Sequence, residues 1–453
     1  MSQPISIPPE LFPIIASFIP LRYAPKTLLS LALVNHHFYW VARPLLYSRI
    51  VVGNEENTRM VLKKIINEPQ LGMAITEIYI MTELSEDTLD GKHESYDVMG
   101  GLRYISVKKK LVPRLVALHI YLLDGWFEPF RNTNSSMLGK SYSPFRLSFW
   151  TTLRVVCPQL QSLSLRNMGY ASFDLNSWLE GDVVDEIMSF SQLSTLRIEC
   201  QSNGCGLQNE DMKRILGALP RFTTSLFTLS LNGKYESIKP VLSLHLPNLR
   251  WLRLCMFVPG DLPEVMGFFR RHEQLESLSL MYSSISFLYS GQWFSDNVED
   301  QFLPNLKHLK ATFDNILTLA PILPRLISLS FAESVNFQVP YLLRAVIPDG
   351  LPRLKSLEIE SARCSFYSPE DIEFSESIIW HETADGHFVI HSDSGTFVPR
   401  SFCDDYIRSI VRGAPNLEEL GLHRFALSST DVVSSLSKLA VVFLHLLNSF
   451  SSN

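Results

Sequence analysis

One hydrophobic pattern recurs along most of the chain. From about residue 70 onward, an aliphatic residue is followed by two variable residues, a second aliphatic, one variable residue and a third aliphatic. The last two aliphatics alternate as in a β-strand and point into one core, while the first belongs to the turn that leads into the strand. The pattern begins at Ile75, Leu115, Leu160, Leu193, Leu226, Leu249, Leu275, Leu306, Leu326, Leu354, Leu417 and Leu439.

Helix-like stretches separate these predicted strands. They cover residues 60–67, 183–190, 211–219, 264–272, 341–346 and 405–412. Several units enter their strand through Pro-x-Leu, as at Pro158 and Pro247, because proline ends the preceding helix and favours an extended start. A strand inside and a helix outside in each unit predicts an α/β horseshoe with parallel strands.

A different pattern occupies residues 1–50. Apolar residues from Leu11 to Ile19 recur at helical spacing, and a second helical run extends from Leu28 to Ala42. A Pro-Leu-Leu-Tyr segment at 44–47 closes the second run. A helical module of this size has only a marginal core, so its excess apolar residues favour a partner surface.

The same residues carry a resemblance to a known family. The string IPPELFPIIASFI, followed by LLSLALVNHHFYWVARPLLY, resembles an F-box, with Ile7 where Leu is usual and Tyr47 where Trp is frequent. The resemblance covers about residues 5–50 and implies a three-helix module that packs onto the Skp-type adaptor of an SCF ubiquitin ligase. The adaptor-binding residues that it implies are Pro8, Leu11, Ile14, Ile15, Leu28, Leu29, Leu31 and Val34.

The charge of this module suits such a partner. Residues 1–50 carry Arg22, Lys26, Arg43 and Arg49 against Glu10 alone, and a basic tip would speed the encounter with an acidic adaptor. The alternative is that the helices only cap the repeat array, since repeat proteins require capping units at their ends.

The repeats resemble the leucine-rich repeats of many F-box proteins, including large fungal families. Successive units begin 20 to 45 residues apart, with one interval of 63, and none has the usual Asn or Cys three residues after its last strand aliphatic. The hydrogen-bonding ladder of those residues is therefore not expected, and we predict an irregular horseshoe. The expected divisions are an F-box module at 1–50, a linker with a degenerate first repeat at 51–110, and the repeat array at 111–453.

Variable residues beside the strand aliphatics are candidates for a target-binding face. They point to the side of the strand opposite the core. Aromatic, Arg and Met residues are enriched at protein interfaces, which singles out Trp251, Arg253 and Met281. The full candidate set is His119, Tyr121, Arg166, Arg197, Trp251, Arg253, Met281, Lys310, Glu358 and His423.

The long interval holds an insertion at about residues 361–402. Residues 378–380 and 388–390, joined through Asp385-Gly386, predict a hairpin, because Asp-Gly supplies the positive φ that a tight turn needs. Residues 366–405 contain nine acids and one base. Such a loop either contacts a basic target or only keeps the surface solvated.

Nothing in the sequence nominates a catalytic site or a cofactor. The formal net charge of −6 disfavours a phosphate-binding surface, and neither Gly-x-x-x-x-Gly-Lys nor Gly-x-Ser-x-Gly occurs. Glu382, His387 and His391 come near the spacing of a zinc site, but two histidines on one hairpin face are seldom sufficient. We therefore expect no metal, no nucleic-acid partner and no enzyme activity.

The expected function is that of a substrate-recognition adaptor. The F-box would hold the adaptor and cullin core of the ligase, and the repeats would hold an unidentified protein substrate. Scattered cysteines and the lack of a long apolar segment place the chain in the cytoplasm or nucleus, away from the membrane. Two alternatives are a leucine-rich-repeat scaffold or inhibitor that acts without ubiquitination, and an enzyme that uses the insertion hairpin.

Overall fold

The computed structural model describes most of the repeat array and part of the opening segment. The chain forms two compact units, Met1–Leu249 and Arg250–Asn453, which are considered separately below. The described residues are 8, 11, 14–15, 19, 24–52, 55–82, 112–122, 147–167, 181–200, 209–233, 237–281, 292–295, 298–334, 338–347, 349–361, 377–382, 388–393 and 408–423.

The first unit opens with two helices packed against each other, α2 (Ala24–Ala32) and α3 (His36–Ser48). The predicted second run is thus two helices, because Asn35 begins a new one. The side-chain Oδ1 of Asn35 accepts a hydrogen bond of 2.9 Å from the backbone N–H of Phe38, which satisfies a free donor of the first turn. Helices α4 (Glu55–Asn67) and α5 (Pro69–Gly72) follow.

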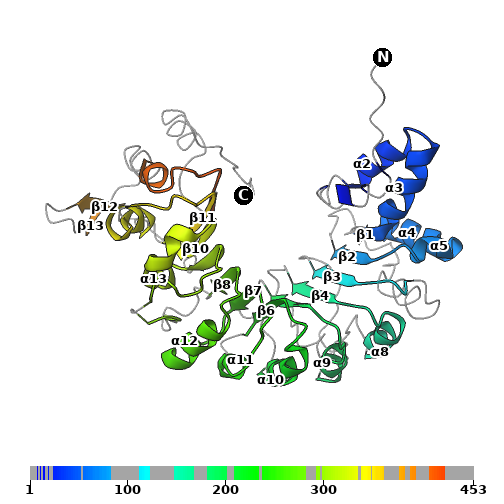
Figure 1. Cartoon of the computed structure of the whole chain (residues 1–453), viewed down its shortest axis with the longest axis horizontal. Helices are drawn as coiled ribbons and strands as arrows, with labels where there is room; N and C mark the ends of the chain where they lie inside the picture. Colours follow the sequence, from blue (N-terminus) through cyan, green and yellow to red (C-terminus); the bar gives the residue numbers. More distant parts are fainter. Residues whose placement is uncertain are drawn as a thin grey trace, which may run out of the picture. The chain divides into compact units, whose positions relative to one another are not determined.

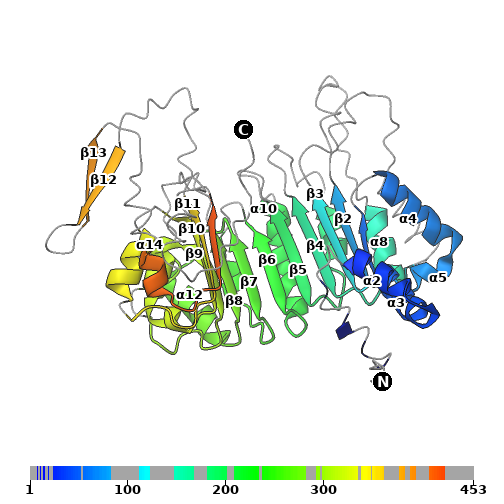
Figure 2. The same ribbon diagram turned by 90° about the horizontal axis from the view of Figure 1, so that it is seen from above.

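Six strands of the first unit pair in chain order, and every pair is parallel (Figure 2). Aliphatics of the same place in the pattern lie in register, as Leu118, Leu163, Leu196 and Leu229 do, and they are buried. The predicted burial of the strand aliphatics is therefore confirmed, although Ser164 and Ser230, on the opposite side of β4 and β6, are buried as well. The strands are β1 (Arg49–Val52), β2 (Glu77–Thr82), β3 (Ala117–Leu122), β4 (Ser162–Asn167), β5 (Thr195–Cys200) and β6 (Thr228–Asn232).

A repeated backbone contact sets this register. The carbonyl of Thr76 accepts hydrogen bonds from the N–H groups of Val116 and Ala117, at 2.7 and 3.0 Å. The carbonyls of Val116, Gln161 and Ser194 each accept two such bonds from the next repeat. Each turn thereby fixes where the next strand starts, which prevents a one-residue slip that would expose the core side.

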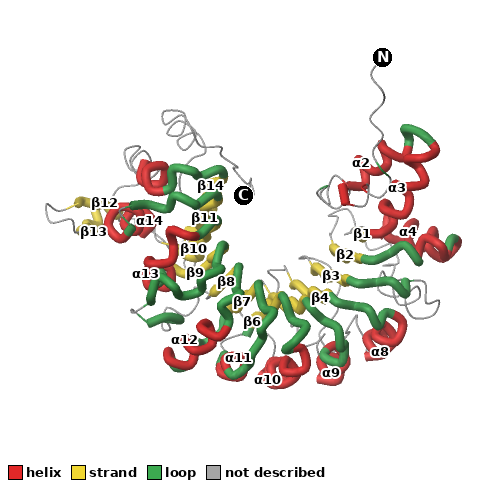
Figure 3. Tube along the Cα trace, in the orientation of Figure 1, coloured by secondary structure: helices red, strands yellow, loops and turns green. Residues whose placement is uncertain are grey.

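Helices cover the outer side of this unit (Figures 1 and 3). Neighbouring helices are joined by ion pairs, from Arg154 to Glu186 at 2.6 Å and from Arg214 to Asp185 at 3.0 Å. Helix α8 was not predicted, and its buried face includes Trp150. The outer elements are α8 (Leu147–Val156), α9 (Gly181–Ile187), α10 (Asn209–Ala218), the 3-10 helix η5 (Leu219–Phe222) and α11 (Lys239–Leu242).

The second unit repeats the same arrangement, with parallel strands on one side and helices on the other (Figure 1). The α/β repeat fold expected from the sequence is thus confirmed in each unit. Its strands are β7 (Trp251–Cys255), β8 (Ser277–Met281), β9 (His308–Thr312), β10 (Ser328–Ser334), β11 (Ser356–Ser361) and β14 (Glu419–His423). Its helices are α12 (Leu262–Arg271), α13 (Phe313–Thr318), η6 (Ala320–Arg325), α14 (Gln338–Tyr341), η7 (Leu342–Val346) and the helical residues 408–413.

The predicted insertion interrupts the sequence but not the sheet. Strand β11 pairs directly with β14, with Ser356 in register with Glu419. Within the insertion, β12 (Ser377–Glu382) and β13 (Phe388–Asp393) form a separate antiparallel pair, which confirms the hairpin. The Asp385-Gly386 turn lies outside the described residues, as does the last predicted repeat at Leu439.

Asparagines form a ladder at a place that was not predicted, in the turns before the strands. The side-chain amide of Asn305 donates a hydrogen bond of 3.0 Å to the carbonyl of Glu273 in the preceding turn. Asn248 and Asn416 bond in the same way to Thr224 and Pro352, at 2.8 and 2.7 Å. These asparagines belong to Pro-Asn-Leu turns at 247–249, 304–306 and 415–417, and this recurring triplet was the available signal in the sequence.

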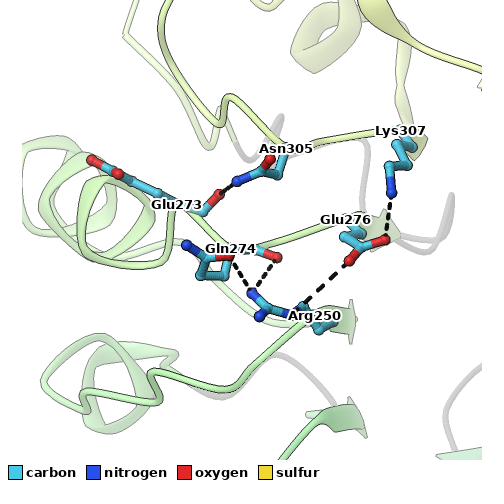
Figure 4. A network of polar contacts seen from close by, with 6 residues as sticks. All are labelled: Arg250, Glu273, Gln274, Glu276, Asn305 and Lys307. Atoms are coloured by element: carbon cyan, nitrogen blue, oxygen red, sulfur yellow. Dashed lines mark hydrogen bonds and ion pairs between the residues drawn. The ribbon is translucent and has the colours of Figure 1, made fainter.

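Charged side chains reinforce the same turns in the second unit (Figure 4). Arg250 donates hydrogen bonds of 3.1 and 2.7 Å to the carbonyl and the side-chain oxygen of Gln274. Glu276 pairs with Lys307 at 2.8 Å, and hydrogen bonding from Lys307 lowers the pKa of Glu276. The turn that enters each strand is thus tied to its neighbour by side chains as well as by backbone.

Candidate functional site

The opening helices expose an unusual amount of apolar surface. Of the 15 large apolar residues that are exposed in the described part of the chain, eight lie between residues 11 and 40. Leu33 is the most exposed of these, at 78%. We call this set the apolar surface of the opening helices; it consists of Leu11, Ile14, Ile15, Leu29, Leu33, Val34, Tyr39 and Trp40.

Most residues predicted to bind the adaptor are on the surface. Pro8, Leu11, Ile14, Ile15, Leu29 and Val34 are exposed, and Leu31 is half-buried. Leu28 is an error of the sequence analysis, because its side chain is only 5% exposed. It lies one turn before the buried Ala32, on the side of α2 that is covered within the unit, so Leu28 cannot contact a partner.

The sequence analysis missed three exposed apolar residues, Leu33, Tyr39 and Trp40. Leu33 follows Leu29 by four positions, which is the spacing of one helix face and was the available signal. On α3, the indole N–H of Trp40 donates a hydrogen bond of 3.0 Å to Nε2 of His36, and the Tyr39 and Trp40 rings lie 5.7 Å apart. These contacts hold the rings in place while leaving Trp40 55% exposed.

Two of the four basic residues expected to face a partner form ion pairs inside the unit. Arg43 forms an ion pair of 3.2 Å with Glu68 at the start of α5, and Arg49 one of 3.1 Å with Glu77 on β2. Hydrogen bonding from Lys64 lowers the pKa of the same Glu68 carboxyl. These arginines therefore join the opening helices to the first repeats, whereas Lys26 is exposed and Arg22 lies outside the described residues. Only part of the expected basic charge is thus available for electrostatic steering of a partner.

The strand face of the first unit carries a row of stacked and bonded side chains. Tyr79 on β2 and His119 on β3 are in register, and their rings stack at 4.4 Å. His119 also faces Tyr121 at 6.4 Å, and the Arg166 guanidinium lies 5.5 Å from the Tyr121 ring. Three strands thus contribute to one aromatic and basic surface, which includes three residues of the predicted target-binding set, His119, Tyr121 and Arg166.

A carboxylate organises the other half of this face. Glu199 forms an ion pair of 2.7 Å with Arg166 and accepts a hydrogen bond of 2.6 Å from the hydroxyl of Ser230. At the opposite end, the hydroxyl of Tyr79 donates a hydrogen bond of 3.0 Å to Glu77. Burial, with the neighbouring Glu77, raises the pKa of Tyr79 to about 12. The hydroxyl therefore stays protonated and serves as a donor at neutral pH.

The strand face of the second unit is organised differently. Trp251 stacks on His308 at 5.9 Å across the small Ser277 that lies in register between them. The guanidinium of Arg253 donates to the sulfur of Met281 at 3.5 Å. The stack of Trp251 on His308 thus spans from β7 to β9, and the contact of Arg253 with Met281 joins the neighbouring strands β7 and β8.

Lys310 lies between two carboxylates of the same face, 3.6 Å from Glu358 and 3.8 Å from Glu360. His423 is in register with Glu360 on β14, and its side chain lies outside the described part. All ten residues of the predicted target-binding set lie on these strands. That they bind a target stays a prediction.

Groups capable of reaction are few in the described residues. Burial raises the pKa of the Cys157 thiol to about 12, and its sulfur donates to the carbonyl of Val112 at 3.3 Å, so this cysteine is structural. Within the described ranges, no three His, Cys, Asp or Glu side chains gather as metal ligands would. His387 of the considered zinc set lies outside those ranges. No described helix is both long and apolar enough to span a membrane.

Comparisons with known proteins add no family assignment. No family model matches the chain, and no curated protein matches it. Among solved structures, the chain is similar to a chain of the crystal structure of the Rad7 and Elc1 complex in yeast, with 13% sequence identity and a TM-score of 0.38. The alignment covers 97% of this chain and 98% of that chain. A likeness at this level supports no conclusion about function.

Proposed function

We propose that this chain is the substrate-recognition adaptor of an SCF-type ubiquitin ligase. In this proposal, the opening helices bind a Skp-type adaptor and the strand faces bind a protein target. The observation that carries the proposal is the apolar surface of the opening helices, which holds more than half of the large exposed apolar residues of the described chain. Covering such a surface is worth about 25 cal/mol per Å² of apolar area, so a partner is favoured there.

The exposed residues argue against the alternative that these helices only cap the repeats. A capping unit covers the apolar end of an array and presents a polar outer side to solvent. Here Leu28 and Ala42 are buried, while Leu29, Leu33 and Val34 of the same segment are exposed. The helices therefore have an inner apolar side, which is buried within this chain, and an outer apolar side, which is free to contact a partner protein.

The strand faces support binding rather than catalysis. Their charged groups are arranged as ion pairs and stacks between repeats, as with Arg166 and Glu199. The hydroxyl of Ser230 does bond to the carboxylate of Glu199 at 2.6 Å, but that carboxylate is also held in an ion pair by Arg166, so we interpret the contact as a link between repeats. Holding a target beside a ligase raises the effective concentration of its lysines at the transferring enzyme, so the receptor needs no reactive group of its own.

Capture of a purified Skp-type adaptor tests the proposal. Leu29→Asp and Val34→Asp place a charge on the apolar surface of the opening helices, and each should reduce adaptor binding by about tenfold or more, measured by biolayer interferometry. Val155→Asp is the matched control, since Val155 is 64% exposed on α8, away from these helices, and its binding should equal that of the unaltered chain.

Circular dichroism of each variant should be unchanged, because both positions are exposed in the free protein. If the unaltered chain captures no adaptor, or if Val155→Asp loses binding as Leu29→Asp does, the ligase assignment is wrong. A chain that still binds a protein on its strand faces would then be a scaffold or inhibitor that acts without ubiquitination.

A further inference from the structure

Three side chains on the strand face of the first unit share one register position. His119 on β3 pairs with Ser164 on β4, which pairs with Arg197 on β5. Neighbouring strands lie about 4.8 Å apart, so the three side chains start along a line of roughly 10 Å across the strands. Arg197 is also close enough to His119 for its charge to act on the imidazole.

Each of these three residues has a polar side-chain group for which the described chain provides no hydrogen-bond partner. The hydroxyl of Ser164 is buried at 0% exposure and makes no hydrogen bond to any described residue. The Nδ1 atom of His119 is buried and has no described partner either. No hydrogen bond or ion pair links Arg197 to the described residues, whereas Arg166 on the adjacent strand is paired with Glu199.

Buried donors without partners are rare in folded proteins and call for an explanation. A ligand that supplies acceptor oxygens would satisfy all three groups at once. The hydroxyl and an imidazole N–H donate single hydrogen bonds, and the guanidinium donates two parallel ones in a fork that matches a carboxylate. We call the three residues the anion row.

The charge of the anion row distinguishes between anions. Burial lowers the pKa of His119, so its imidazole is neutral at pH 7 and Arg197 provides the one formal positive charge. Two carboxylates add negative potential near the row. Glu199 is bound by Arg166 and Ser230, and Glu77, whose charge acts on His119, is bound by Arg49 and Tyr79. One free cation beside fixed carboxylates suits a monoanion and disfavours a dianionic phosphate group.

We infer that His119, Ser164 and Arg197 form a subsite for the side-chain carboxylate of an Asp or Glu residue in the protein target. This inference rests on the proposed function, since it names the chemistry that the strand face recognises. The target would then be an acidic segment that needs no phosphorylation.

The test uses small probes and the full chain, so it needs neither the target nor the adaptor. The signal of His119 in a ¹H–¹³C spectrum of ¹³C-histidine protein is assigned by its loss in His119→Gln. N-acetylglutamate amide should shift this signal saturably, and N-acetylglutamine amide, which is neutral, should not. O-phosphoserine should bind more weakly than the glutamate probe.

Two variants connect the binding to the anion row. Arg197→Gln should weaken the glutamate probe by about tenfold or more. Ser164→Ala should weaken it about threefold without lowering the melting temperature, since it removes a buried hydroxyl that has no partner in the described chain. Arg221→Gln removes an exposed guanidinium from η5 and should leave the dissociation constant unchanged.

Three results would overturn the inference. The first is equal binding of the glutamate probe by Arg197→Gln and the unaltered chain, and the second is an equal shift with the glutamine probe. The third is tighter binding of O-phosphoserine, which would reassign the row to a phosphorylated residue. Adaptor capture depends on Leu29 in the opening helices, so failure of the proposed function would appear in that separate assay.

Discussion

The opening helices and the repeats use the same amino acids in opposite ways. Leu329 on β10 is 0% exposed, and Leu33 at the end of α2 is 78% exposed. Each strand leucine is enclosed by the next repeat, so the array satisfies its apolar residues by adding copies of itself. The opening helices are not copies of the repeat, and eight of the 15 large apolar residues exposed in the described part of the chain lie between residues 11 and 40. This difference marks the surface at which we propose that another protein binds.

The largest expected difference between the two regions is the cost of shortening a leucine. Leu329→Ala should lower the free energy of unfolding by about 3 kcal/mol, because it leaves a cavity in a closed core. Leu33→Ala should change it by less than about 0.5 kcal/mol, because solvent already surrounds that side chain. Urea denaturation followed by circular dichroism measures both. Equal losses would mean that Leu33 is packed inside the protein and that the comparison fails.

The second prediction concerns a turn that only glycine fits. Gly350 has φ +71°, and a Cβ added there would lie 2.6 Å from the carbonyl oxygen of Gly413. Gly350→Ala should therefore destabilise the repeats by about 2 kcal/mol. Gly217→Ala, in α10 with open space around it, should stabilise them by up to about 1 kcal/mol. The urea midpoints should move in opposite directions, and a shift in the same direction would contradict this reading of the turn.

A third prediction compares two asparagines, one in each region, whose removal should cost a similar amount of unfolding free energy. Asn35→Ala removes the cap of α3 and should cost about 1 kcal/mol. Asn305→Ala removes a bond of the turn ladder and should cost about the same. Hydrogen exchange separates them, since Asn35→Ala should speed exchange in α2 and α3 alone. Faster exchange throughout the repeats would show that the helices do not open as a separate unit.

The smallest predicted effect is a pH dependence that comes from the repeats. Burial lowers the pKa of His119 below its ordinary value of 6.5, so the unfolded chain takes up the proton first as the pH falls. The stability that the neutral imidazole contributes is complete above pH 6.5 and is lost as the pH falls through the folded pKa. The difference in unfolding free energy between the unaltered chain and His119→Gln should therefore be smaller at pH 5.5 than at pH 7.5. A difference that grows on acidification would contradict the assignment.

The strands could be predicted because two separate signals in the sequence indicate each of them. Leu163 and Leu165 show the period of two that a strand requires, and Leu160 fixes the turn before them. Both signals recur in every unit, so an error at one repeat is corrected by the next. The prediction of parallel strands with a buried side follows from this redundancy.

Helix α8 was missed because its polar residues favour other structures. Thr151 and Thr152 are weak helix formers, and their hydroxyls bond to the carbonyls of Leu147 and Ser148, at 3.1 and 2.7 Å. The helix is stabilised by burying Phe149 and Trp150 in the tertiary fold. Such packing is not visible in local propensity.

The errors in the candidate site have the same origin. Leu28 and Leu29 are adjacent and equally apolar, and only the packing of the first unit decides which of them is buried. Arg43 and Arg49 were expected to face a partner, but they bind Glu68 and Glu77, which lie 25 and 28 residues further along the chain. A single sequence contains no signal for such pairs.

Because β11 pairs directly with β14, the number of residues between these two strands does not change how they pair. Each new strand is positioned by contacts with the turn before it, as when the N–H groups of Glu418 and Glu419 bond to the carbonyl of Lys355. The entropic cost of closing a flexible loop rises by only about 0.6 kcal/mol for each doubling of its length. We therefore expect this junction to tolerate insertions. A foreign peptide or small domain that replaces the hairpin should leave the paired strands in their positions.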